Sequence, residues 1–79
     1  MISQQQFIEQ FREQYIGDDA AQIEFSSEFR KISSWDSLTG MALIVMIKDT
    51  YNVDMTADDL KSCVTVKDVY DFVEAKAVA

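Results

Sequence analysis

Apolar side chains recur at helical spacing along most of the chain. Over residues 3–16 they follow each other at offsets of one, four and eight positions, which predicts an amphipathic helix. The apolar side of this helix consists of Phe7, Ile8, Phe11 and Tyr15. Ser3 is placed to cap its start, with Gln6 as the partner in a capping box. Gly17 is expected to stop it.

The next segment, residues 17–35, has no clear period and predicts a long loop. A loop of this length in a small domain is usually functional or held by its own side chains. Five of its residues are apolar and could hold it, namely Ile23, Phe25, Phe29, Ile32 and Trp35. We expect Phe25, Phe29 and Ile32 to hold the loop over the helix ends. A direct role of these residues in function is an equally open interpretation.

A second helix is predicted from Asp36, which is a suitable N-cap, to about Tyr51, with Asn52 as its end. Residues 41–47 are all apolar, so this helix is apolar on two sides. A chain this short is not expected to bury both sides. We assign one side to the core, namely Leu43, Ile44, Ile47 and Tyr51. We assign the other to a partner surface, namely Leu38, Met41 and Val45.

Two further helices follow a short extended connector at residues 53–55. Thr56 and Asp59 have capping-box spacing and predict a short helix to about Ser62, with Leu60 as its main core contact. Residues 65–68 repeat this signature and predict a last helix to about Ala75. Its buried side is expected to contain Val66, Val69, Tyr70 and Val73, with Phe72 alongside.

Composition agrees with a helical domain. The chain has 79 residues, 48% of them hydrophobic, with two glycines and no proline. These apolar residues are enough for one core, and the few turn-forming residues make many strands improbable. We therefore expect a single domain over residues 1–79. Its predicted class is all-α: a small four-helix bundle with three longer helices, one short helix and a long loop between the first two.

Charge narrows the classes of partner. Acidic residues outnumber basic ones 14 to 7, for a net charge of −7. This disfavours nucleic acids and anionic membranes and favours basic protein surfaces. The longest apolar run is too short to cross a bilayer, and the N-terminal residues do not resemble a signal peptide. We expect a cytoplasmic monomer without membrane insertion.

The absence of histidine narrows the chemistry. The sequence has no histidine and one cysteine, Cys63, so it cannot form a histidine-assisted nucleophile, a histidine zinc site or an internal disulfide. We expect Cys63 to be a small buried or edge residue rather than a nucleophile. The absence of histidine counts against an autonomous enzyme, and we expect no catalytic and no metal-binding residues.

Ser37 is the residue most suited to chemistry. It falls at the first position of the second predicted helix, after the Asp36 cap. Its hydroxyl is expected to face solvent beside free backbone N–H groups and the positive end of the helix dipole. A phosphate ester is tolerated at such a position.

The chain resembles the acyl carrier protein family over essentially its whole length. The resemblance rests on Asp36-Ser37-Leu38 at the start of the second helix, on Tyr51 and residues 53–55 after it, and on the openings of the last two helices. It implies that a separate phosphopantetheinyl transferase, with magnesium, attaches 4′-phosphopantetheine from coenzyme A to Ser37. The thiol of this arm then carries an acyl group as a thioester, sheltered between the helices.

The resemblance also implies a surface for partner enzymes, namely the transferase and an acyl ligase or synthase with a basic docking face. The residues implied are Asp36, Leu38, Met41, Val45, Asp49, Asp54 and Asp58. The sequence departs from the family pattern at Ser34, Trp35, Thr39, Gly40, Ala42, Lys48 and Thr50. The second helix is therefore less acidic than usual, which indicates a dedicated lipid or specialised pathway.

Two alternatives to an acyl carrier stay open, and a third is weakened by the sequence. An aminoacyl carrier, for example for D-alanine, is the second candidate, although Leu38 fits its usual motif poorly. A helical interaction module without the prosthetic group is the third. A calcium sensor is suggested by the spacing of Asn52, Asp54, Thr56 and Asp58. It fails where that motif needs glycine and glutamate, because Ala57 and Cys63 stand there.

Overall fold

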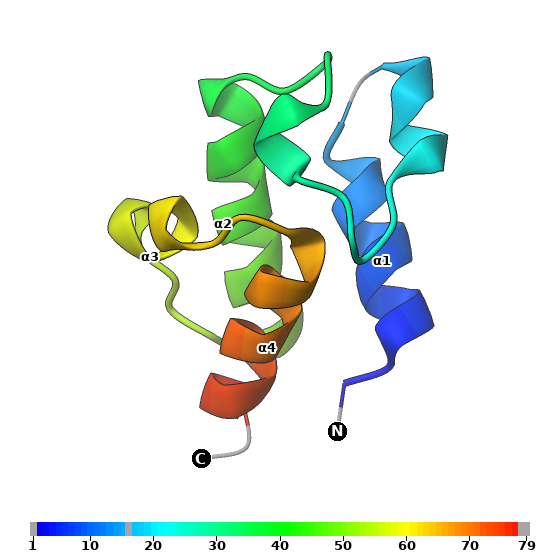
Figure 1. Cartoon of the computed structure of the whole chain (residues 1–79). Coiled ribbons are helices and arrows are strands. Elements are labelled where there is room, and N and C mark those ends of the chain that lie inside the picture. The colour runs from blue at the N-terminus through cyan, green and yellow to red at the C-terminus, as the bar shows by residue number, and fades with distance from the viewer. Residues whose placement is uncertain (1, 16, 78–79) are drawn as a thin grey trace.

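The computed structural model describes residues 2–15 and 17–77, and these residues form helices joined by loops (Figure 1). The helices are α1 (Gln4–Glu13), α2 (Ser37–Tyr51), α3 (Ala57–Ser62) and α4 (Val66–Ala77). Two 3₁₀ helices, η1 (Asp18–Gln22) and η2 (Phe29–Lys31), occupy the first loop. No strand occurs in the described ranges. The all-α prediction is confirmed, and the long loop predicted between the first two helices contains two short 3₁₀ helices that the sequence analysis did not anticipate.

Helix α1 is shorter than predicted. Ser3 caps it, since its hydroxyl accepts from the Gln6 N–H at 3.3 Å, but the helix ends at Glu13. The N–H groups of Gln14 and Tyr15 bond three residues back, at 3.2 and 3.1 Å, which tightens and closes the last turn. Gly17 therefore precedes η1 in an extended conformation and does not stop α1. Ile16, the predicted last residue, lies outside the described residues.

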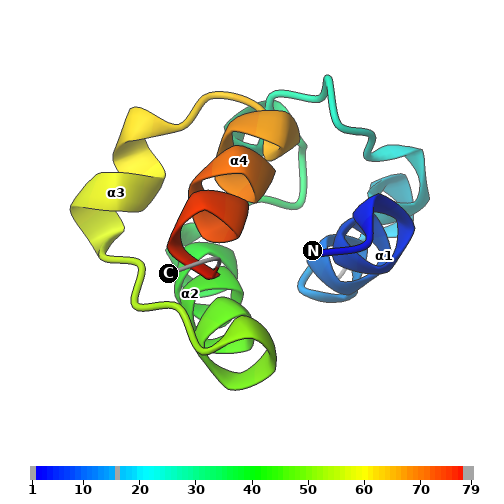
Figure 2. The ribbon, with the colours of Figure 1, turned by 90° about the horizontal axis from the view of Figure 1, so that it is seen from below.

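Helices α2 and α4 lie between α1 on one side and α3 on the other, as Figures 1 and 2 both show. The fully buried side chains come from all three long helices and from the first loop: Phe7, Phe11, Ile23, Phe29, Leu43, Ile47, Val66, Val69 and Val73. Burying one such side chain contributes about 1.5–3 kcal/mol. The predicted buried side of α4 is confirmed, and the helix continues two residues past Ala75.

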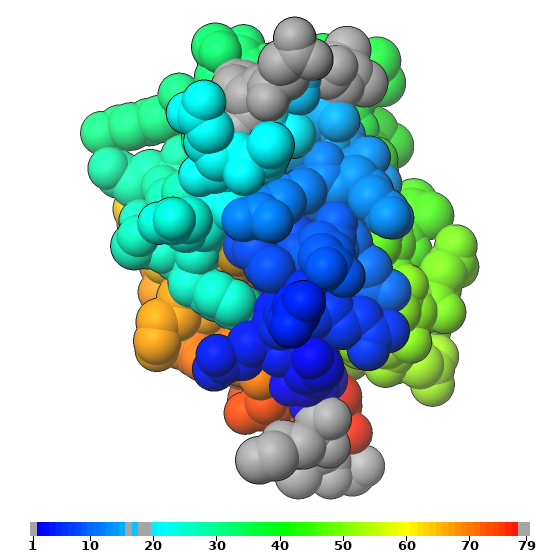
Figure 3. Space-filling model, turned by 90° about the vertical axis from the view of Figure 1, so that its right-hand side faces the viewer, coloured from blue at the N-terminus to red at the C-terminus, as the bar shows by residue number. Residues whose placement is uncertain are grey.

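The first loop is anchored by aromatic contacts, and α1 covers the centre of the face beside it (Figure 3). Phe29 is fully buried, and its ring centroid lies 5.8 Å from that of Phe11. Phe25 and Ile32 are partly buried against the core, so the predicted anchoring role of these three residues is confirmed. Arg12 adds a polar tie, because its guanidinium donates to the Ile23 carbonyl at 2.9 and 2.6 Å.

The two apolar sides of α2 differ in burial as predicted, with two exceptions. Leu43 and Ile47 are fully buried, but Ile44 and Tyr51 are only partly buried. Met46 is buried instead. The side predicted to face partners is exposed, with exposed fractions of 75% for Leu38, 64% for Met41 and 55% for Val45.

Of the three predicted capping boxes, those of α3 and α4 are present with hydrogen bonds in both directions, whereas at the start of α1 only the bond from the Gln6 N–H to Ser3 is found among the described residues. Thr56 and Asp59 exchange two hydrogen bonds of 3.1 Å at the start of α3, where Leu60 is buried as predicted. Thr65 and Asp68 exchange bonds of 3.0 and 3.2 Å at the start of α4. The capping box of α3 stabilises this helix, which has six residues and therefore little stability of its own.

Candidate functional site

The site is built at the start of α2, where Asp36 caps the helix as predicted. Its carboxylate accepts from the backbone N–H of Thr39 at 2.8 Å and from the Thr39 hydroxyl at 3.0 Å. These hydrogen bonds, the backbone one first, lower the pKa of Asp36 below its ordinary value. Asp36 is thus anionic at neutral pH. The sequence analysis missed the buried Thr39, although its position three residues after the cap is the signal for this role.

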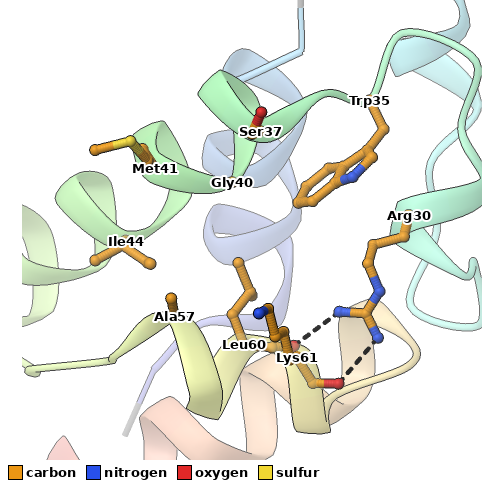
Figure 4. Close-up of a pocket in the computed structure, with 9 residues that line it drawn as sticks. All are labelled: Arg30, Trp35, Ser37, Gly40, Met41, Ile44, Ala57, Leu60 and Lys61. Atoms are coloured by element: carbon orange, nitrogen blue, oxygen red, sulfur yellow. Dashed lines mark hydrogen bonds between the residues drawn. The ribbon is translucent and has the colours of Figure 1, made fainter.

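Ser37 is the first residue of α2 and is exposed. Figure 4 shows its hydroxyl pointing away from Leu60 and Lys61. No described residue forms a hydrogen bond with this hydroxyl, so it is free to meet a partner molecule. The predicted position of Ser37 at the solvent-facing mouth of α2 is therefore confirmed.

A groove of about 480 Å³ opens beside Ser37 between α2, α3 and the end of the first loop (Figure 4). We call it the Ser37 groove. Its lining residues are Arg30, Trp35, Ser37, Gly40, Met41, Ile44, Ala57, Leu60 and Lys61. The four residues from α2 have offsets of three, four and seven from Ser37, so they lie on one side of the helix. From this spacing the sequence could have predicted a third functional side of α2, between the buried side and the exposed side that contains Leu38 and Val45.

Gly40 allows the Trp35 side chain to pack closely against α2. A Cβ atom at position 40 would lie 3.1 Å from Trp35 Cη2 and 3.6 Å from Leu60 Cδ2. Two aromatic rings also pack against the indole, because its ring centroid lies 5.5 Å from that of Phe29 and 6.1 Å from that of Tyr15. The bulky residue before the cap and the glycine inside the helix are therefore complementary.

Arg30 fixes the opposite wall of the groove. Its guanidinium donates to the carbonyls of Leu60 at 2.9 Å and Lys61 at 3.2 Å, and also to the carbonyl of Cys63. Leu60 and Lys61 lie in the last turn of α3 and Cys63 is its C-cap, and the Leu60 carbonyl also accepts from the Cys63 N–H at 3.1 Å. Arg30 therefore binds the carbonyls at the C-terminal end of this helix, where helical partners run out. The sequence analysis did not identify Arg30, because its three acceptors are thirty or more positions away.

The residues implied as partner contacts do not share one hollow. Met41 lines the Ser37 groove, and Leu38 lies with Asp36 in a smaller hollow on the other side of the helix start. Val45 lies with Asp49 and Asp54 in a third hollow, farther along α2. Asp54 is paired with Lys48 at 3.0 Å. Asp58 is exposed on α3 and lines none of these three hollows.

Other candidate chemistry finds little support in the described part of the chain. It contains no group of three or more metal-ligating side chains, so the calcium alternative gains nothing. Cys63 is buried as predicted, and this burial raises the pKa of its thiol and disfavours the reactive thiolate. No helix among the described residues is long and apolar enough to cross a membrane.

A family model described as the phosphopantetheine attachment site matches residues 5–73, and the chain belongs to this family. It is therefore a phosphopantetheine carrier protein, and its cofactor is covalently bound 4′-phosphopantetheine. Carrier domains of this kind are generally non-catalytic, and they generally interact with phosphopantetheinyl transferases and synthase enzymes.

The residues at the start of α2 fit this group. A free exposed hydroxyl at a helix N-terminus can carry a phosphodiester, because the helix dipole favours negative charge there. The apolar groove beside it can receive a flexible arm or what the arm carries. Ser37 and this groove are thus chemically suited to the cofactor.

Proposed function

We propose that the chain carries acyl intermediates on a phosphopantetheine arm attached to Ser37. The observation that supports this most strongly is the free, exposed hydroxyl at the start of α2 beside an apolar groove. The resemblance to acyl carrier proteins is centred on the same serine. On this proposal residues 1–79 act as one carrier domain without catalysis of its own.

Attachment requires little of this chain beyond an accessible nucleophile. The Ser37 oxygen forms a bond to the phosphorus that bears the pantetheine in coenzyme A. Adenosine 3′,5′-bisphosphate leaves, and the serine proton passes to a base on the transferase. When attached, the arm supplies a thiol that holds an acyl group as a thioester. Asp36 holds the first turn of α2 in place and keeps Ser37 presented to solvent.

The apolar lining of the groove favours an acyl over an aminoacyl cargo. Trp35, Ile44 and Leu60 offer contacts to a methylene chain, which gains about 0.8 kcal/mol for each buried CH₂ group. An aminoacyl group such as D-alanyl is short and cationic, and no acidic residue that could pair with it lines the groove in the described part of the chain. The aminoacyl carrier remains the second candidate, and a module without the arm remains the third.

Partner enzymes are proposed to dock on the exposed side of α2. Leu38, Met41 and Val45 supply apolar contact there. Asp36, Asp49, Asp54 and Asp58 would face basic residues of the transferase and of an acyl ligase or synthase. The low acidity of α2 favours enzymes of a dedicated lipid or specialised pathway over a general fatty-acid synthase. A monomeric state and a cytoplasmic location stay predictions.

Intact mass spectrometry tests the proposal directly. The chain is incubated with coenzyme A, magnesium and a broad-specificity phosphopantetheinyl transferase, beside a Ser37→Ala variant and a known carrier as positive control. We expect a gain of one phosphopantetheine arm in the wild type and none in the variant. Ser33→Ala, in the loop before α2, is the matched control and should gain the arm. A folded wild type without a gain, beside a working control, would contradict the proposal.

A further inference from the structure

The Ser37 groove has an unusual charge for this protein. Among the nine described residues that line it, Arg30 and Lys61 are basic and none is acidic, although the chain has 14 acidic and 7 basic residues. Three other hollows on the described surface each contain at least one acidic residue. The first contains Asp36, the second Asp49 and Asp54, and the third Asp71 and Glu74. The groove beside Ser37 is therefore a positively charged site on an acidic molecule.

Lys61 also has no charged partner among the described residues. Lys31, Lys48 and Lys67 are paired with carboxylates at 3.3, 3.0 and 3.0 Å. The ammonium of Lys76 lies 5.6 Å from the ring centroid of Phe72. Within the described part of the chain, Lys61 alone among the lysines has neither an ion pair nor a ring contact. Its exposed ammonium group is thus available to an anion.

Arg30 adds a second, fixed positive charge. Its guanidinium bonds to backbone carbonyls of α3 and to no carboxylate among the described residues, so its charge is not neutralised. Figure 4 shows the Arg30 guanidinium and Lys61 on the same side of the groove, with Met41 on the other side. The groove thus combines an apolar wall from α2 with a basic edge at the end of α3.

We propose that the groove selects an acyl cargo that carries a carboxylate near its free end. The methylene groups lie against Ile44, Leu60 and the Trp35 indole, while the carboxylate meets Lys61 and the field of Arg30. An apolar groove without cations would disfavour such a cargo, because its carboxylate would lose hydration without a partner. This inference rests on the proposed attachment at Ser37 and adds the chemical class of the cargo.

The test compares two cargoes that differ only at the free end, adipoyl and hexanoyl, each loaded on the phosphopantetheinylated chain. The rate of hydroxylamine cleavage of each thioester is measured relative to the same acyl-coenzyme A. A cargo held in the groove protects its thioester. We expect adipoyl to be protected about threefold more than hexanoyl, as for an exposed ion pair. This excess protection should vanish in Lys61→Gln, return in Lys61→Arg and weaken in high salt.

Lys67→Gln is the matched control, because it removes one exposed lysine outside the groove and should keep the excess protection. A direct readout is the nuclear Overhauser effect between the methylene beside the adipoyl carboxylate and Leu60 or Lys61. Equal protection of the two cargoes in the wild type, or equal excess in Lys61→Gln, would overturn the inference.

The phosphodiester of the arm is a second anion that Lys61 could bind. The same samples distinguish binding of the phosphodiester from binding of the cargo carboxylate. If Lys61→Gln changes the ³¹P shift of the arm without cargo and leaves the adipoyl contacts unchanged, Lys61 serves the phosphate and the inference is wrong. A chain that cannot be loaded at Ser37 at all contradicts the proposed function itself. A chain that is loaded with both cargoes and protects their thioesters equally contradicts only the inference.

Discussion

The indole of Trp35 packs against Gly40, so closely that a Cβ atom at position 40 would come nearer to the ring than ordinary van der Waals contact. A Cβ atom there would lie 3.1 Å from Trp35 Cη2 and 3.4 Å from Cζ2. The glycine weakens α2, since glycine in a helix is about 1 kcal/mol less favourable than alanine. This contact joins the loop before the cap to the side of α2 that lines the Ser37 groove.

A double-mutant cycle measures this contact. Gly40→Ala should stabilise a Trp35→Leu background by about 1 kcal/mol, the helix-propensity gain, because the smaller side chain leaves space for the methyl group. In the wild type the gain should be offset by displacement of an indole that Phe29 and Tyr15 hold. Urea unfolding of the four proteins gives the coupling. Equal effects of Gly40→Ala in both backgrounds would show that Trp35 does not restrict position 40.

Removal of the Arg30 guanidinium should loosen α3. Arg30→Met keeps the aliphatic stem but removes the donors for three carbonyls, and we expect a loss of about 2 kcal/mol in the free energy of unfolding. Amide exchange in α3 should accelerate more than in α1. The control is Lys31→Met, whose exposed pair with Glu28 should change stability by less than about 0.5 kcal/mol. Similar losses in the two variants would contradict a special role of Arg30.

The caps of α2 and α4 predict a dependence of stability on acid. Hydrogen bonds from Thr39 lower the pKa of Asp36, and those from Thr65 and Val64 lower the pKa of Asp68. A carboxyl whose pKa is lower in the folded state stabilises the fold above its unfolded pKa. That contribution is lost as the pH falls through 3.8 and on through the lower folded value.

The variant Asp36→Asn/Asp68→Asn checks this dependence. Asparagine also caps helices but does not titrate, so the variant should lose less stability than the wild type between about pH 5 and strongly acidic pH. Unfolding free energies across that range give the comparison, and Asp49→Asn, which caps no helix, serves as the control for removal of one exposed charge. Parallel curves for wild type and double variant would contradict the assignment.

The exposed apolar side of α2 predicts a loss of partner recognition without a loss of stability. Leu38→Ala should lower the rate constant of phosphopantetheinyl transfer at limiting carrier by about fivefold, the effect of losing about 1 kcal/mol of contact. Because Leu38 is 75% exposed, the melting temperature of the variant should hardly change. Val64→Ala, at an apolar residue that is 50% exposed outside α2, should leave the rate unchanged. Equal rates for Leu38→Ala and the wild type would exclude Leu38 from the transferase contact.

The acidic residues around α2 predict electrostatic steering of basic partners. Charge reversal in Asp49→Lys/Asp58→Lys should slow association by about tenfold at low salt and flatten its dependence on ionic strength. Asp54 should contribute less, because Lys48 already neutralises part of its charge. Stopped-flow association with a partner enzyme at several salt concentrations gives both quantities. Rates that do not respond to salt in the wild type would rule out steering.

The four α-helices, the N-caps at which they start and the exposure of Ser37 could be predicted from the sequence, whereas the end of α1 and the two 3₁₀ helices of the first loop could not. These features depend on local rules: apolar spacing marks Phe7 and Phe11 as buried, and capping boxes mark the starts of α3 and α4. Leu38 and Leu43 were separated correctly into exposed and buried, because their positions on one helix differ by a fixed angle. The family match at residues 5–73 agrees with the resemblance to acyl carrier proteins that centres on Asp36-Ser37-Leu38.

The groove and its charge, in contrast, arise from packing between segments that are far apart in the sequence. Arg30 reaches carbonyls on α3, and Trp35 lies over Gly40, because the first loop folds back against α2 and α3. No local period encodes such contacts. The same packing left Ile44 half-buried at the groove and buried Met46 in the core, since the position of α3 sets which side of α2 is covered. Local chemistry thus marked where the arm is proposed to attach, and long-range packing formed the surface beside it.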